Sequence, residues 1–168
     1  MSARRILFVC SGNTCRSPLA ERLARREAEE RGLDDVEVRS AGTFAGRGAP
    51  ASRGAVLAAR RQGLDLSGHR STPLGPELVE WADLVLAMTN AHLRVATDVG
   101  GGEKAALVTE YLPEDHPEYG REVGDPAGAG VERYEEVLRL LETAVGGVLD
   151  AIDPDHVADA DSGRREGG

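Results

Sequence analysis

The sequence predicts a single α/β domain in which a four-stranded parallel sheet is flanked by helices on both faces. Short apolar runs alternate with longer amphipathic segments along the chain, a pattern typical of parallel sheets covered on both sides. At 168 residues the chain has the length of one domain and can bury a proper core. We assign residues 1–152 to this domain and expect residues 153–168 to form a disordered acidic tail.

Four short segments have the pattern of strands. The segment from Ile6 to Val9 is apolar at every position, which is typical of a parallel strand buried on both faces. Val36 and Val38 are separated by one residue, so they share one face of a second strand. The expected strands are residues 6–9, 36–41, 84–88 and 105–108.

Five segments carry helix signals. In the first, Leu19, Leu23 and Ala24 lie on one helical face, and Gly32 ends the pattern. The expected helices are residues 18–31, 52–62, 76–81, 90–97 and 131–152. Between them, residues 42–50 are rich in turn formers, and residues 111–130 form a long loop of the kind that is usually functional or mobile.

The turn between the first strand and the first helix has the sequence VCSGNTCRSP. Gly12 and Asn13 tolerate positive φ, which lets successive backbone N–H groups point into one concavity. Ser17 suits an N-cap and Pro18 a first helical turn, so a helix N-terminus faces the same concavity. Arg16 adds a guanidinium that can hold two phosphate oxygens. The turn is therefore expected to be a phosphate-binding loop, with the residues Ser11, Gly12, Asn13, Thr14, Cys15 and Ser17.

Cys10 lies at the base of this positive field. Helix N-termini and cationic neighbours favour the thiolate form of cysteine, so we expect Cys10 to be a thiolate at neutral pH. A thiolate beneath a bound phosphate can attack phosphorus in line and form a phosphocysteine that water later hydrolyses. The Ser17 hydroxyl could stabilise the sulfur as it leaves.

Cleavage of a phosphoester or phosphoramidate also needs a proton for the leaving group. Asp125, in the GDPAG segment of the long loop, is the candidate because Pro126 biases its backbone toward an extended conformation. Asp-Pro is also ordinary turn chemistry, so the combination with the cysteine loop carries the prediction. The expected catalytic residues are Cys10, Arg16 and Asp125.

The composition limits the partners and the compartment. A net charge of −9 and a pI near 5.0 argue against general nucleic-acid binding. No apolar run reaches the ~20 residues of a membrane span, and the N-terminus lacks a signal peptide. The only two cysteines lie in the loop, so no disulfide framework is expected and a reducing, cytoplasmic location is favoured.

No metal or cofactor is expected. The four histidines lack metal-ligand spacing with cysteines or carboxylates, and each is expected to be a surface or loop residue. They are His69, His92, His116 and His156. Asp153 and Asp155 are expected to belong to the solvated acidic tail.

With these features together, the chain resembles the low-molecular-weight protein tyrosine phosphatase family. The match is carried by FVCSGNTCRSPLAE (residues 8–21), VRSAG (38–42), ADLVLAM (82–88) and the Asp-Pro pair at 125–126. The resemblance implies a four-stranded parallel sheet, a phosphocysteine mechanism and phosphorylated protein substrates. It assigns Cys10 as nucleophile, Arg16 as phosphate clamp and Asp125 as general acid. It also implies that Ser40 helps Asn13 to hold the loop.

The substrate prediction depends on one loop position. Thr14 stands where tyrosine phosphatases of this family commonly have a bulky aliphatic residue, and Ala127-Gly128 stands where they are commonly aromatic. The bacterial protein arginine phosphatases of the family are similar to this chain in having threonine there, which favours phosphoarginine as substrate; the alternative is that Thr14 merely fills the loop. Phe44 is a candidate pocket wall, with core or loop packing as the alternative.

Several alternatives remain open from the sequence. Cys15 either packs the loop or traps oxidised Cys10 as a disulfide, which would make the enzyme redox-sensitive. A tyrosine phosphatase is the main alternative activity. An arsenate reductase is disfavoured because no relay cysteine follows Cys15. An inactive phosphate-binding module is also disfavoured, because a protein that only binds has no advantage in keeping Cys10, Arg16 and Asp125 together. The oligomeric state is not predicted.

Overall fold

Four parallel strands form one sheet in the order β2-β1-β3-β4. The computed structural model describes residues 4–153. The strands are β1 (Arg5–Cys10), β2 (Glu37–Gly42), β3 (Leu84–Ala87) and β4 (Ala105–Leu107). The predicted single α/β domain with a four-stranded parallel sheet is confirmed. Most strand ends differ by one residue from the expected bounds.

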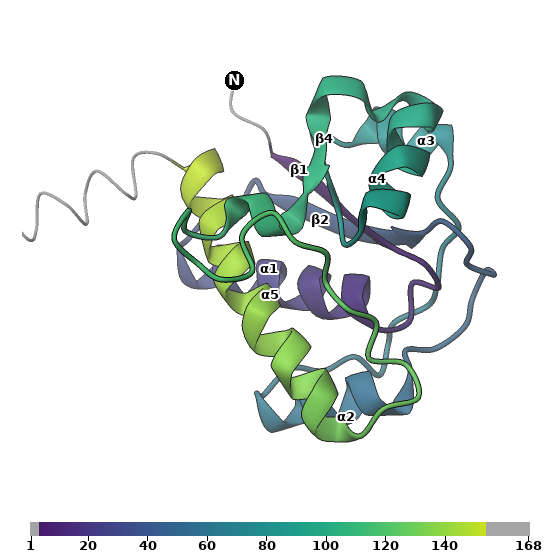
Figure 1. Ribbon diagram of the computed structural model, residues 1–168, viewed down its shortest axis with the longest axis vertical. Coiled ribbons are helices and arrows are strands. Elements are labelled where there is room, and N and C mark those ends of the chain that lie inside the picture. Colours follow the sequence, from purple (N-terminus) through teal and green to yellow (C-terminus); the bar gives the residue numbers. More distant parts are fainter. Residues whose placement is uncertain (1–3, 154–168) are drawn as a thin grey trace, which may run out of the picture.

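Helices cover both faces of the sheet, as Figure 1 shows. One face packs against α1 (Arg16–Glu30), α2 (Arg53–Arg61) and α5 (Val131–Ile152), and the other against α3 (Pro76–Trp81) and α4 (Asn90–Ala96). Three short helical turns, η1 (Thr97–Gly101), η2 (Gly102–Lys104) and η3 (Val108–Tyr111), flank β4. The expected helices are therefore all present.

The side chains of β1 point alternately into two hydrophobic clusters, one on each face of the sheet. Ile6 and Phe8 face the larger cluster beneath α1 and α5, whereas Leu7 and Val9 face the smaller cluster beneath α3. All four side chains are fully buried, as expected for a central parallel strand. This burial fixes β1 rigidly, so the residues that follow its end are held in place.

The strand order places the loop after β1 at a switch point. From β1 the chain passes to β2 on one side of the sheet, and later to β3 on the other. The two connections leave in opposite directions, which opens a crevice at the carboxyl end of β1. Cys10 is the last residue of β1, so the cysteine loop begins in that crevice.

Two local expectations at the start of α1 are wrong. The N-cap is Cys15, not Ser17, because Ser17 already lies in the first helical turn, and its hydroxyl faces Cys10 Sγ. Asn13 adopts the left-handed conformation with φ of 56°, but Gly12 does not. The loop curls at one residue, and Pro18 occupies the first turn of α1 as expected.

The expected tail, residues 153–168, lies outside the described residues except for Asp153. The same holds for His156. Within residues 4–153, no helix is long and apolar enough to cross a membrane.

Candidate active site

The backbone of the cysteine loop forms a concavity of unsatisfied donors. Residues 11–15 connect β1 to α1, and their N–H groups donate to no other group in the described part of the chain. Asn13 is fully buried and provides the turn, with φ of 56°. Free amides beside a helix N-terminus are the arrangement that binds a tetrahedral oxyanion.

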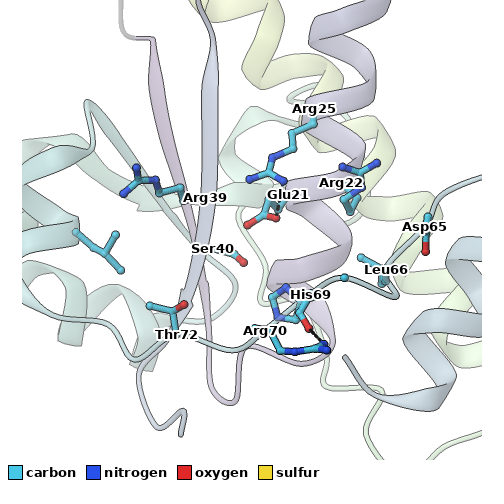
Figure 2. Close-up of a pocket in the computed structure, with 12 residues that line it drawn as sticks. Glu21, Arg22, Arg25, Arg39, Ser40, Asp65, Leu66, His69, Arg70 and Thr72 are labelled. Atoms are coloured by element: carbon cyan, nitrogen blue, oxygen red, sulfur yellow. Dashed lines mark hydrogen bonds and ion pairs between the residues drawn. The ribbon is translucent and has the colours of Figure 1, made fainter. Parts of the chain in front are cut away.

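Four hydrogen bonds hold Asn13 in this strained conformation. Its amide nitrogen donates to Ser17 Oγ at 2.8 Å and to Ser40 Oγ at 2.9 Å. Its amide oxygen accepts from Thr72 N at 2.9 Å, and its carbonyl lies 2.6 Å from His69 Nε2. Figure 2 shows Ser40, His69 and Thr72 among the residues that line one pocket. Because every polar group of the side chain is satisfied, the loop is fixed before any ligand arrives.

Cys10 is buried at the base of the loop, with 2% of its surface exposed. Its Sγ lies 2.9 Å from Ser17 Oγ. Since Ser17 Oγ already accepts from Asn13, its own hydrogen can be donated to the sulfur. The sulfur therefore lies at the end of a chain of two hydrogen-bond donors, Asn13 and Ser17.

Arg16 and Asp125 meet at the rim of the loop. Arg16 is almost completely buried and donates to Val123 O at 2.9 Å. Its second terminal nitrogen lies 3.7 Å from Asp125 Oδ2. Asp125 is half exposed and accepts from Ala127 N at 3.0 Å, which fixes the turn after it. The long loop therefore returns to the cysteine loop and brings a carboxyl beside it.

His92 is a contact that the sequence analysis missed. Its Nε2 lies 2.7 Å from Ser11 Oγ, and the residue is 4% exposed on α4. Burial, reinforced by the charge of Arg16, lowers the pKa of His92 to about 4, so the ring is neutral at pH 7. The expectation of a surface or loop residue is wrong for His92, because α4 packs against a face of the sheet and buries this side chain beside Ser11. Its position just after β3 was the available signal.

Gly42, at the end of β2, was also missed. A Cβ at this position would overlap Ser11 O and lie 2.9 Å from Asn13 N. The close approach lets the backbone of residues 43 and 44 donate to Cys10 O and Ser11 O. The glycine of the VRSAG segment therefore allows β2 to support the loop.

The two predicted specificity residues lie at the outer side of the loop. Thr14 is half-buried, and its carbonyl accepts from Ser52 N at 2.9 Å. Phe44 is 91% exposed, which excludes the core-packing alternative. Its backbone N–H donates to Ser11 O, so the ring is carried next to the loop without packing against it.

Cys15 packs between α1, α2 and α5. It is buried, and its Sγ lies 3.2 Å from Ser52 Oγ and 3.7 Å from Tyr134 OH. Both cysteines are free thiols. The packing role is therefore visible in the structure, and the disulfide role stays a prediction.

In residues 4–153 no group of three potential ligands is placed to hold a metal ion.

Comparisons with known proteins show which proteins this chain is similar to. A family model described as low molecular weight phosphotyrosine protein phosphatase matches residues 5–158. The chain is 42% identical over 139 residues to a protein-arginine-phosphatase of Bacillus subtilis (strain 168), covering 82% of this chain and 89% of the relative. It is 36% identical over 155 residues to a low molecular weight protein-tyrosine-phosphatase of Streptomyces coelicolor, covering 88% and 93%.

A solved structure gives the same picture. It is described as the YwlE arginine phosphatase, in a mutant with a phosphorylated active site serine. The TM-score is 0.77 at 40% identity, and the match covers 86% of this chain and 92% of the other. The similarity therefore extends over the whole α/β domain.

Proposed function

Because the chain belongs to the low molecular weight phosphotyrosine protein phosphatase family, we propose that it hydrolyses phosphoarginine on proteins through a phosphocysteine intermediate. The observation that carries the proposal is the donor chain from Asn13 through Ser17 to Cys10 Sγ, placed beneath free loop amides. We propose residues 1–152 as the phosphatase domain and the cytoplasm as its location.

In the first step the Cys10 thiolate attacks phosphorus in line with the bond to the leaving nitrogen. The loop amides and Arg16 hold the phosphoryl oxygens and stabilise the charge that develops on them. The S–P bond forms, the P–N bond breaks, and Asp125 gives its proton to the leaving guanidine. The Asp125 contact with Arg16 at 3.7 Å supports this placement.

In the second step water attacks the phosphocysteine. Asp125, now a carboxylate, takes the proton from water as the new P–O bond forms and the S–P bond breaks. The Ser17 hydroxyl stabilises the departing thiolate from 2.9 Å. Free phosphate leaves, and the enzyme returns to its starting state.

Preference for phosphoarginine rests on Thr14 and Asp125. A threonine hydroxyl offers a polar contact to a guanidine, and an unpaired buried polar group costs about 1–3 kcal/mol, so discrimination can be large. The Asp125 carboxylate also attracts the positive charge of the released guanidinium. The arginine phosphatase from Bacillus subtilis supports this choice.

Phosphotyrosine is the second candidate substrate. Phe44 is 91% exposed beside the loop, and an exposed ring can stack on the aromatic group of a phosphotyrosine. The Streptomyces coelicolor relative, named as a tyrosine phosphatase, supports this alternative.

We also propose that the site is redox-sensitive. Peroxide oxidises the Cys10 thiolate to a sulfenic acid, and the Cys15 thiol then displaces water to form a disulfide. With excess peroxide, activity should be lost in both proteins and regained with dithiothreitol in the wild type. In Cys15→Ser the sulfenic acid has no thiol partner and peroxide oxidises it further to a sulfinic acid, which dithiothreitol does not reduce. Identical recovery in the two proteins would exclude the disulfide.

A chemical trap tests the proposed function. A phosphoarginine peptide mixed with the enzyme and quenched in acid should show phosphate on the peptide that contains Cys10, by mass spectrometry. The Asp125→Asn variant should turn over at least 100-fold more slowly, since the general acid is lost. The Cys10→Ser variant should not turn over the peptide or para-nitrophenyl phosphate. Full activity in Cys10→Ser would contradict the mechanism.

A further inference from the structure

A second cavity lies on the other side of the residues that hold Asn13. It has a volume of about 540 Å³ and is lined by α1, the middle of β2, the loop over residues 65–72 and Leu78 of α3. In Figure 2, Arg22 and Arg25 project from α1, whereas His69 and Arg70 come from the loop. The volume lies within the range of small-molecule sites, roughly 300–1,000 Å³.

The lining is basic although the whole chain is acidic. Four arginines contribute to it against two carboxylates, Glu21 and Asp65, while the net charge of the chain is −9. The arginines are Arg22, Arg25, Arg39 and Arg70. A local excess of cations in an acidic protein attracts anions to this cavity.

Two of the arginines are already engaged. Arg25 donates through Nε and a terminal nitrogen to Val38 O and pairs with Glu21 at 3.4 Å. Arg39 stacks on Trp81, with its guanidinium carbon 4.4 Å from the ring centroid. In Figure 2 the Arg39 guanidinium points away from the cavity.

Arg22 and Arg70 have unused donors. The Nε of Arg22 is buried and lacks a hydrogen-bond partner within residues 4–153. Neither residue has a carboxylate within ion-pair distance among the described residues, and Arg70 uses one nitrogen for His69 O. A buried, unpaired guanidinium donor is costly unless a ligand satisfies it.

The two carboxylates do not fill this need. Glu21 is paired with Arg25. The Ser67 side chain and the Ser67 N–H, which donates to Asp65 at 2.8 Å, lower the pKa of its exposed carboxyl, and the charge of Arg22 adds a smaller effect from beyond ion-pair distance. Arg22 and Arg70 are therefore available to hold an anion between α1 and the loop.

The same wall also supports the cysteine loop. Ser40, His69 and Thr72 line the cavity, and the same three residues bond to Asn13. A ligand that draws the loop over residues 65–72 toward α1 would act on the bonds that fix Asn13. The cavity and the active site thus share one wall.

We propose that this cavity binds a small molecule with at least two anionic oxygen groups, phosphate or carboxylate, held by Arg22 and Arg70. Binding there changes the affinity of the cysteine loop for its phosphorylated substrate. The proposal does not depend on whether that substrate is phosphoarginine or phosphotyrosine.

The test is a titration followed by NMR of the full chain, with inorganic phosphate present at saturation to occupy the cysteine loop. Pyrophosphate and citrate are the two probes. The probe that binds more tightly shows whether the site prefers phosphate or carboxylate groups. The amides of Arg22, Gly68, His69 and Arg70 should shift. Arg22→Ala and Arg70→Ala should each weaken binding at least fivefold, and Arg139→Ala, which removes an exposed charge on α5, should change it less than twofold.

Three results would overturn the proposed anion site: no binding of either probe, shifts confined to residues 11–16, or equal affinity in all three variants.

The proposed effect of this site on the cysteine loop is measured separately. The probe that binds should change the KM for para-nitrophenyl phosphate more than threefold in the wild type and Arg139→Ala, and not in Arg22→Ala. An unchanged KM in the saturated wild type would overturn the coupling.

Discussion

At the scale of single residues, the cysteine loop depends on side chains that are far away in the sequence. Asn13 bonds to Thr72, 59 positions away, and Arg16 bonds to Val123, 107 positions away. The residue types of the loop predict an anion cradle, because glycine, asparagine and arginine have known local preferences. Their partners are set by how distant segments fold, so Thr72 and Val123 had no local signal in the sequence.

His92 should make the stability of the protein sensitive to mild acid. Its pKa is about 4 when folded, against an ordinary value of 6.5, so the unfolded chain binds a proton that the folded protein excludes. Through this group, the free energy of unfolding of the wild type should therefore fall by about 2 kcal/mol between pH 7 and pH 5. The slope is at most about 1.4 kcal/mol per pH unit.

Urea unfolding of the wild type and His92→Gln at both pH values measures this contribution. Glutamine can still bond to Ser11 but does not titrate, so the stability advantage of the wild type at pH 7 should shrink by about 2 kcal/mol at pH 5. A constant difference between the two proteins would show that His92 is not buried in its neutral form.

At the scale of elements, α5 closes the larger core against α1 and η3, and Figure 1 shows it alongside α1. Arg31, which follows α1, pairs with Glu27 at 2.7 Å and with Asp150 of α5 at 2.8 Å. The backbone of α5 comes closest to η3 at Gly147, where an added Cβ would overlap the Tyr111 carbonyl. The glycine is required by this contact, although glycine alone disfavours a helix.

Two neighbouring glycines of α5 provide a matched comparison. Gly147→Ala should destabilise the protein by about 2 kcal/mol, because α5 must move away from η3. A Cβ at Gly146 would lie 3.6 Å from Glu27 Oε1, an ordinary contact. Gly146→Ala should therefore stabilise by up to about 1 kcal/mol through helix propensity.

Thermal or urea unfolding of the two variants separates these effects. Similar changes in both would mean that α5 does not approach η3 closely at Gly147.

At the scale of the whole molecule, the alternation of strands and helices was sufficient to predict the fold. The helices at 76–81 and 131–152 have the expected bounds, and Gly75-Pro76 and Gly130 mark where they begin. The sequence did not reveal that α4 carries His92 to the loop. It predicted two roles for Ser17, and the structure shows the predicted contact with the sulfur but not the predicted helix cap. These features arise from tertiary packing, which can override local preference.

The fold as a whole does not decide the substrate. The cysteine loop and the nearby Asp125 carboxyl suit a phosphoarginine and a phosphotyrosine alike. In the proposal, the choice between them is made at Thr14, at the outer side of the loop.

The most direct test compares kcat/KM for one peptide carrying phosphoarginine and a matched peptide carrying phosphotyrosine, in the wild type and in Thr14→Ile. The wild type should prefer phosphoarginine at least tenfold, and Thr14→Ile should reduce that ratio at least tenfold, equivalent to about 1.4 kcal/mol. A wild-type preference for phosphotyrosine, or a ratio that Thr14→Ile leaves unchanged, would contradict the assignment.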